Sequence, residues 1–117
     1  MSDSPTDCIF CKIVSGELGT EFVAESAHAV AFNDIAPHAP THVLIVPRRH
    51  IPSLADLTEN DAELLGEMIS LANQVARERG IDASGYRLVT NVGKDGGQEV
   101  PHLHWHLLGG RALKFRP

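Results

Sequence analysis

Three histidines stand at alternate positions near the C-terminal end of the chain, in the run His102-Leu103-His104-Trp105-His106. Successive side chains of a β-strand point to opposite faces, so a strand here would place the three imidazoles on one face. Two residues of strand rise would separate neighbouring rings by roughly 6.6 Å, a spacing that suits one phosphate group or one metal ion. Neutral imidazole is a base and a nucleophile near pH 7. The run therefore predicts either phosphoryl chemistry or a metal site, against the plainer alternative of a hydrogen-bonded histidine-rich strand.

The segment Gly96-Gly97-Gln98-Glu99 lies directly before the histidine run. Glycines allow backbone N–H groups to approach a phosphate closely, and such donors stabilise charge that develops on phosphoryl oxygens. An imidazole nucleophile on phosphorus also needs a partner on its second ring nitrogen to fix the tautomer. The loop and the histidines together favour nucleophilic displacement at phosphorus.

Cys8 and Cys11 form a Cys-x-x-Cys pair near the start of the chain. Such a pair is half of a zinc site and needs two further ligands, for which histidines are the candidates. The alternatives are two idle thiols and, less favoured, a redox pair, because no preceding strand sets up a thioredoxin-like unit.

The remaining histidines differ in context. His50 follows a strand end and two arginines, where a metal ligand is plausible. His28 is expected at the surface and His38 in solvent, within a proline-containing loop. His42 opens an apolar strand and is expected to be a hydrogen-bonded structural residue rather than a ligand.

Hydrophobic periodicity and breakers predict an α+β domain with five strands. A short helix is expected within 8–15 and a long helix over Glu59–Arg79, opened by a capping box at Thr58 and ended by Gly80. The expected strands are Phe22–Glu25, His28–Phe32, Thr41–Pro47, Tyr86–Asn91 and the histidine strand, and Arg111–Pro117 forms a tail. Thr41–Pro47 is apolar on both faces, which is typical of a covered central strand.

Length and composition limit the function classes. A chain of 117 residues with 43% hydrophobic and 21% charged residues indicates one globular domain over 1–117. The net charge of −5 gives no electrostatic footprint for nucleic acid or an anionic membrane. We expect a cytoplasmic protein, because the N-terminus lacks a secretory pattern and no apolar run is long enough to span a bilayer.

The segment from Gly96 to Arg111, GGQEVPHLHWHLLGGR, resembles the signature of the histidine triad (HIT) family of nucleotide hydrolases and transferases. Three upstream segments match the family in the same order: CIFCKI, AFNDIAPHAPTH and IVPRRHI. The resemblance covers nearly the whole chain and is strongest to the Hint branch, the purine nucleoside phosphoramidases. It implies a HIT-like fold, namely a five-stranded antiparallel sheet with one long helix and a short N-terminal helix.

The resemblance also implies the chemistry. Nucleoside 5'-phosphoramidates, or related conjugates of a purine nucleoside monophosphate, would be hydrolysed through a covalent nucleotidyl-histidine intermediate, with His104 as nucleophile and His106 on the phosphoryl oxygens. No catalytic metal or organic cofactor takes part, and the usual assembly is a homodimer. The implied nucleotide-binding residues are Ile9, Phe10, Ile13, Phe32 and Leu44 at the base, Asp34 and Ile35 at the ribose, and Asn91, Gln98 and Glu99 at the phosphate.

Family members with Cys-x-x-Cys hold a structural zinc ion, and the matching positions here are Cys8, Cys11, His50 and His102. Three positions depart from the Hint pattern. Glu99 stands where animal members of the Hint branch have serine, Pro101 replaces a frequent aromatic residue, and Trp105 is bulkier than the usual aliphatic. Two other functions remain open: a catalytically weak purine-nucleotide-binding regulatory module, and a zinc hydrolase with His102 and His104 on a catalytic metal.

Overall fold

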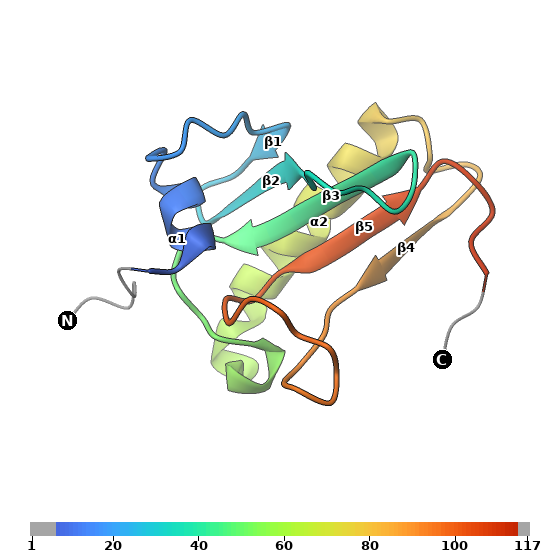
Figure 1. Ribbon diagram of the computed structural model, residues 1–117. Helices are drawn as coiled ribbons and strands as arrows, with labels where there is room; N and C mark the ends of the chain where they lie inside the picture. The colour runs from blue at the N-terminus through green and yellow to red at the C-terminus, as the bar shows by residue number, and fades with distance from the viewer. Residues whose placement is uncertain (1–6, 115–117) are drawn as a thin grey trace.

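The computed structural model describes residues 7–114, so the last part of the predicted tail lies outside it. One antiparallel sheet runs through the molecule in the order β1-β2-β3-β5-β4 (Figure 1). The strands are β1 (Ala24–Glu25), β2 (Ala29–Asn33), β3 (Thr41–Pro47), β4 (Tyr86–Val89) and β5 (Trp105–Gly109). This confirms the predicted five-stranded sheet, with β3 at its centre and β4 at one edge.

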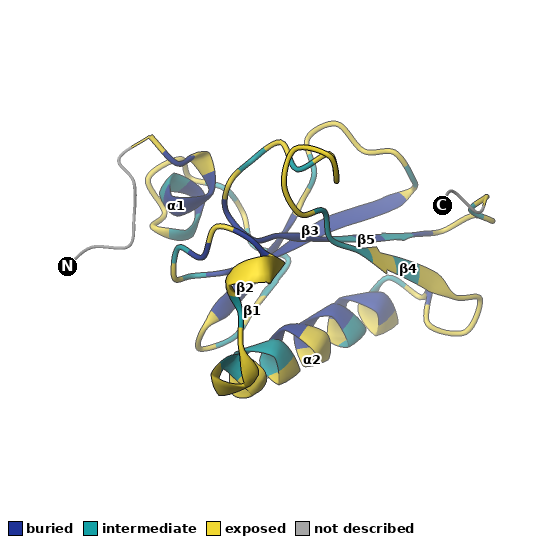
Figure 2. Cartoon of the chain, turned by 90° about the horizontal axis from the view of Figure 1, so that it is seen from below, coloured by how far each residue is buried: buried dark blue, intermediate teal, exposed yellow. Residues whose placement is uncertain are grey.

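Helix α2 (Ala62–Glu78) covers one face of the sheet with its apolar side, as Figure 2 shows. Its buried residues are Met68, Leu71, Ala72, Val75 and Ala76. The predicted capping box is present, because Thr58 and Asp61 bond each other's backbone N–H groups. The turn that this box opens, Glu59–Asp61, is 3₁₀ rather than α-helical. The long helix therefore begins three residues later than predicted.

Helix α1 (Ile9–Val14) lies on the opposite face of the sheet (Figure 2). The Sγ atom of Cys8 caps its N-terminus by accepting the Cys11 N–H at 3.4 Å. A helix of six residues is too short to be stable alone, so its packing against the sheet must hold it in place.

Strand β3 separates two apolar clusters, and all seven of its residues are buried. Val43 and Ile45 belong to the cluster beneath α2, whereas Leu44 and Val46 belong to the cluster beneath α1. The prediction of a central strand covered on both faces is confirmed. Its side chains anchor both helices on one rigid element.

The histidine run was expected to lie wholly in one strand, but β5 begins only at Trp105. His102 and His104 therefore precede the strand. The β3–β5 register pairs Ile45 with Trp105, so the pairs that would follow are Val46 with His104 and then Pro47 with Leu103. Proline has no N–H to donate to the ladder, so pairing stops there. The alternation of faces nevertheless persists: Leu103, Trp105 and Leu107 lie in the α2 cluster, whereas His104 contacts Phe10 of α1.

Two other strands are shorter than predicted. The Phe22–Glu25 strand is reduced to Ala24–Glu25, although the Val23 N–H still bonds the Ala31 carbonyl at 2.8 Å. Strand β4 ends at Val89 rather than Asn91, and Asn91 instead bonds the loop of residues 93–98, which we call the glycine loop. No helix within residues 7–114 is long and apolar enough to cross a membrane.

Candidate active site and metal centre

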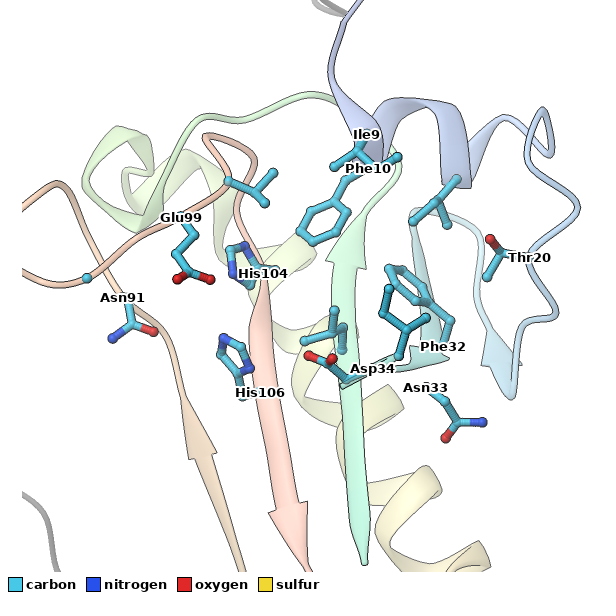
Figure 3. A pocket seen from close by; sticks show the side chains of 15 residues that line it. Ile9, Phe10, Thr20, Phe32, Asn33, Asp34, Asn91, Glu99, His104 and His106 are labelled. Atoms are coloured by element: carbon cyan, nitrogen blue, oxygen red, sulfur yellow. The ribbon is translucent and has the colours of Figure 1, made fainter. Parts of the chain in front are cut away.

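A cavity of about 380 Å³ opens on the α1 side of the sheet, between α1, β2, β5 and the glycine loop (Figure 3). All the predicted nucleotide-binding residues except Gln98 line it, together with His104 and His106. Sequence reasoning missed Thr20, Asn33 and Val100, which also line the cavity together with Gly97 of the predicted phosphate loop. Thr20 and Val100 lie in loops and Asn33 at the end of β2, where no periodic signal marks them, so only the fold brings them to the site.

One end of the cavity is apolar and aromatic. The rings of Phe10 and Phe32 meet edge to face with centroids 5.9 Å apart, and Leu44 lies beneath them on β3. Phe10 also meets the His104 ring edge to face at 5.0 Å. An apolar slot of this kind suits a flat heterocyclic ring, and it places that ring directly beside the histidines.

The polar residues of the cavity divide into two groups, which Figure 3 shows on either side of the histidines. Asp34 lies on the β2 side, and its Oδ1 accepts the Ala36 N–H at 2.8 Å. Asn91 and Glu99 lie on the opposite side, and Asn91 Nδ2 donates to the Gly96 carbonyl at 2.8 Å. Ile35 is fully exposed at the rim.

A hydrogen bond fixes the tautomer of His104, and so determines which of its two ring nitrogens keeps a lone pair. Its Nδ1 lies 2.8 Å from the His102 carbonyl oxygen, which accepts only, so Nδ1 carries the proton. In the neutral ring Nε2 then holds a free electron pair. His104 is buried and lines the cavity, so this pair is the nucleophilic group that the site offers.

His106 is oriented by a residue that the sequence analysis assigned a purely structural role. The His38 N–H donates to Nδ1 of His42 at 3.0 Å, so a neutral His42 carries its proton on Nε2. That Nε2 lies 2.9 Å from Nδ1 of His106 and donates to it. His106 consequently carries its own proton on Nε2, the nitrogen left to act as a donor. The chain from His38 through His42 to His106 presets one N–H donor beside His104.

Only the sheet register reveals this role of His42. Strand β3 pairs Leu44 with His106 and His42 with Leu108, so His42 and His106 share one face two residues apart. A sequence cannot show which β3 residues lie opposite the histidine run. The triad spacing itself gives no signal for a fourth histidine.

Burial keeps these rings neutral. It is the main cause that lowers the pKa of His106 to about 4, and the neighbouring His104 and His42 lower it further. Burial also lowers the pKa of His42, opposed by Asp34, whose Oδ2 lies 3.4 Å from His42 Nε2. Both rings are therefore uncharged near pH 7, which the tautomer assignments above require.

The glycine loop is held in a conformation that larger residues cannot adopt. A Cβ atom on Gly96 would lie 2.3 Å from the Val92 carbonyl oxygen, and Gly97 has a φ of 82°. The Gln98 amide braces the loop: its Oε1 accepts the Gly93 N–H at 2.9 Å, and its Nε2 donates to the carbonyls of Pro52 and Val100. The Gln98 side chain thus points into the loop, and its predicted place at the phosphate stays a prediction.

Cys8, Cys11, His50 and His102 converge on one point at the end of α1, as the sequence predicted. Their ligand atoms all lie within 4.8 Å of one another. Nδ1 of His102 lies 3.4 Å from the Cys8 Sγ and 3.6 Å from the Cys11 Sγ, and 3.2 Å from Nδ1 of His50. Tetrahedral zinc with ordinary bond lengths would separate such ligands by roughly 3.3–3.8 Å. The four donors fit a bound metal ion.

The tautomer of His102 also fits a metal ligand. Its Nε2 lies 3.0 Å from the Pro47 carbonyl oxygen and carries the proton, which leaves the lone pair of Nδ1 directed at the cysteines. Burial lowers the pKa of His102 to about 4. A carbonyl that orients the metal-binding histidine is a common second layer around zinc sites.

Asp34, His42 and His106 form a second group of ligand-type side chains, and two of them, Asp34 and His106, line the cavity. Here a proton already stands between the two imidazoles, because the His38 N–H occupies His42 Nδ1. We therefore describe this group as a hydrogen-bond chain rather than a metal centre.

Comparisons with known proteins agree with this geometry. Residues 15–113 match the family model of the HIT domain. The purine nucleoside phosphoramidase of Escherichia coli K12 is 45% identical over 107 residues, which cover 92% of this chain and 90% of the relative. A HIT family hydrolase from Clostridium thermocellum superposes with a TM-score of 0.92 at 42% identity, over 97% of this chain and 98% of the other. Another from Legionella pneumophila gives 0.91 at 47% identity, over 95% and 99%.

Proposed function

Because the chain belongs to the HIT domain family of hydrolases, we propose that it hydrolyses nucleoside 5'-phosphoramidates or related conjugates of a purine nucleoside monophosphate. The observation that carries this proposal is the pair of opposite tautomers at the cavity. His104 offers a lone pair on Nε2, and His106 offers an N–H on Nε2 next to it. One is a nucleophile and the other an oxyanion donor, which are the two groups that displacement at phosphorus needs.

In the proposed reaction, Nε2 of His104 attacks the α-phosphorus. A nitrogen–phosphorus bond to the histidine forms while the bond from phosphorus to the leaving amine breaks, and the amine takes up a proton from solvent water as it departs. The His102 carbonyl stabilises the positive charge that forms on the His104 ring, because it accepts a hydrogen bond from the Nδ1–H of that ring. Water then cleaves the nucleotidyl-histidine bond and releases the nucleoside monophosphate.

The cavity supports the binding roles that the family resemblance implies. The base would lie in the slot of Ile9, Phe10, Ile13, Phe32 and Leu44, the ribose beside Asp34 and Ile35, and the phosphate between Asn91, Glu99 and the two histidines. The Nε2–H of His106, already oriented by His42, would donate to a phosphoryl oxygen in place of a water molecule.

The metal in this proposal is a structural zinc ion. Cys8, Cys11, His50 and His102 would hold it, and it would join α1 to the segments that follow β3 and precede β5. Zinc supplies folding energy in a closed four-ligand site. It takes no part in the displacement, since neither His104 nor His106 belongs to its ligand set.

We further propose a cytoplasmic homodimer. Strand β4 is a sheet edge whose outer N–H and C=O groups have no strand partner within the described residues. Tyr86 and Leu88 are exposed on β4, and Leu54 is exposed beside the edge. A second copy pairing along this edge would cover these apolar groups.

The test is hydrolysis of adenosine 5'-phosphoramidate by the wild-type protein and by His104→Ala, with metal content measured on both. We expect the variant to lose at least a thousandfold in kcat/KM and to keep one zinc ion per chain. If the wild type turns over substrate no faster than the variant, the proposal that the protein is an enzyme is wrong. The alternative, a purine-nucleotide-binding regulatory module, would then remain. Loss of zinc from His104→Ala, with immediate inactivation by a chelator, would instead indicate a zinc hydrolase.

A further inference from the structure

The protein has a second cavity, of about 540 Å³, on the same face of the sheet as the first, which we call the nucleotide cavity after its proposed ligand. It lies between β4, the loop after β2 and the segment after β5. The two cavities share no lining residue. The register of β4 and β5 pairs Val89 with His106 and Arg87 with Leu108. Arg87 therefore lies on the same face as His106, two residues further along the sheet. The cavity is close to the site but distinct from it.

Four basic side chains line this second cavity, and we name them the basic pocket: His38, Arg87, Arg111 and Lys114. No acidic residue is among its described lining. Within residues 7–114, Arg87, Arg111 and Lys114 take part in no ion pair, whereas Arg48 and Arg49 are each paired with a carboxylate. In a chain of net charge −5, what sets these three cations apart is that they line one cavity together and no carboxylate of the described residues lines it with them.

The two guanidinium groups of the basic pocket are held in place by backbone carbonyls. Arg87 Nη2 donates to the Lys114 carbonyl at 2.8 Å, and Arg111 Nη2 donates to the His38 carbonyl at 2.7 Å. Each group keeps further N–H donors and its full charge. Fixed guanidinium forks lose little entropy on binding and match the oxygens of phosphate or carboxylate.

We propose that the basic pocket is a second binding site, for a small oxyanion of the phosphate class carrying two or more negative charges. A volume of about 540 Å³ is within the range of small-molecule pockets and exceeds what one phosphate fills, so the anion arrives as part of a larger molecule or with water.

His38 links this site to the nucleotide cavity. Its carbonyl accepts from Arg111, while its N–H donates to His42, the residue that orients His106. An anion that binds Arg111 is therefore expected to alter the hydrogen bond from Arg111 to the His38 carbonyl, and through it the hydrogen-bond chain from His38 to His42 and His106. Occupancy of the basic pocket is expected to change the environment of His42 without blocking the nucleotide cavity.

The experiment is a titration of the full-length protein with inorganic phosphate at low ionic strength, followed by residue-resolved NMR with adenosine monophosphate at saturation. The bound nucleotide keeps phosphate out of the first cavity. We expect saturable shifts of the Arg87 and Arg111 side chains and of the His42 ring, with a dissociation constant in the millimolar range. Arg87→Gln should weaken binding roughly tenfold, because one charge-assisted bidentate contact is lost.

The matched control is Arg77→Gln, which removes the same charge from an exposed position on α2 and should leave phosphate affinity unchanged within twofold. Lys114→Gln is a second variant of the pocket, in case Arg87→Gln disturbs β4. The proposal is overturned if phosphate shifts only residues of the nucleotide cavity, or if Arg87→Gln and Lys114→Gln bind it as tightly as Arg77→Gln. If adenosine monophosphate fails to bind, the proposed function is in error, but the Arg87 and Arg111 signals still report on the basic pocket.

Discussion

Hydrogen-bond partners, rather than spacing, make the three triad histidines unequal. His102 donates to a carbonyl from Nε2 and turns Nδ1 to the cysteines, whereas His104 donates from Nδ1 and keeps Nε2 free. His106 accepts on Nδ1 from His42. In the proposed function each ring therefore has one role: His102 binds metal, His104 attacks phosphorus, and His106 donates a hydrogen bond to a phosphoryl oxygen. The fourth histidine is the least obvious in the sequence and sets the state of the third.

Substituting His42 tests this chain. His42→Leu removes the donor that holds His106 with its proton on Nε2, so we expect kcat to fall about tenfold to a hundredfold with zinc content unchanged. His42→Gln, which can still donate a hydrogen bond, should recover part of the loss. The matched control is His28→Leu, because His28 is exposed and bonds Glu67 far from the cavity. Equal activity of His42→Leu and His28→Leu would contradict the positioning role.

The low pKa of His106 predicts a pH dependence of stability. The folded-state pKa is about 4 and the unfolded value is about 6.5, so the unfolded chain binds the proton first as pH falls. His106 therefore contributes stability that is complete above pH 6.5 and is lost as pH falls towards 4. Urea unfolding at pH 7 and pH 5 should show a smaller drop in unfolding free energy for His106→Gln than for the wild type. The same drop in both proteins would show that His106 is not desolvated.

At the scale of elements, short and irregular segments carry the site while the long regular ones carry the core. Helix α1 is six residues long, the glycine loop has no regular structure, and the first two triad histidines precede β5. Side-chain contacts, including those among the four candidate metal ligands, hold these segments in place, rather than a long ladder of backbone hydrogen bonds. Such segments are more sensitive to single substitutions than α2 is.

Cys8→Ser isolates the metal contribution to α1. Serine is a good N-cap, so the cap of α1 is kept while a soft metal ligand is replaced by a poor one. We expect loss of zinc, a fall in melting temperature, and insensitivity to chelators that lower the melting temperature of the wild type. A variant that keeps both its zinc and its wild-type melting temperature would refute the assignment.

Gly96→Ala tests the glycine loop. The added Cβ would meet the Val92 carbonyl oxygen at 2.3 Å, so the loop must move away from the position that lines the cavity. We expect kcat/KM to fall by at least tenfold, with a loss of about 1–3 kcal/mol in unfolding free energy. The control is Gly66→Ala in α2, where an added Cβ meets nothing within 4 Å. It should be active and more stable by about 0.5–1 kcal/mol.

At the scale of the molecule, the sheet divides the protein into a core side and a functional side. Helix α2 lies on one face, and α1 lies on the other (Figure 2). The α1 side also holds both the nucleotide cavity and the basic pocket. The remaining open feature is the β4 edge. The proposed dimer would bury the exposed apolar side chains there, and the buried Nε1 of Trp105, which has no hydrogen-bond partner within residues 7–114, lies beside the same edge.

Leu88→Lys tests the proposed dimer, since a charge on an edge strand opposes strand pairing between copies. We expect light scattering after size-exclusion chromatography to give a dimer for the wild type and a monomer for the variant. Ile69→Lys, at an exposed position on α2 away from the edge, is the control and should remain dimeric. A monomeric wild type, or dimeric Leu88→Lys, would exclude pairing through β4.

The sequence alone determined the features that local rules control. Alternating and helical periodicity predicted the five strands, both helices and the covered central strand. The histidine run with its flanking glycines predicted a phosphate or metal site, and the family resemblance named most residues that line the cavity. These features follow from neighbouring residues, so they can be read without knowing where the chain goes next.

Only the tertiary structure decided how the histidines share their roles. The β3–β5 register brings His42 opposite the triad, Pro47 stops the ladder before Leu103, and the carbonyls of Pro47 and His102 set two tautomers. It likewise gathered Arg87, Arg111 and Lys114 into one pocket from separate segments. A proton on one ring nitrogen or the other depends on which group the fold places at 3 Å, and spacing along the chain carries no information about that.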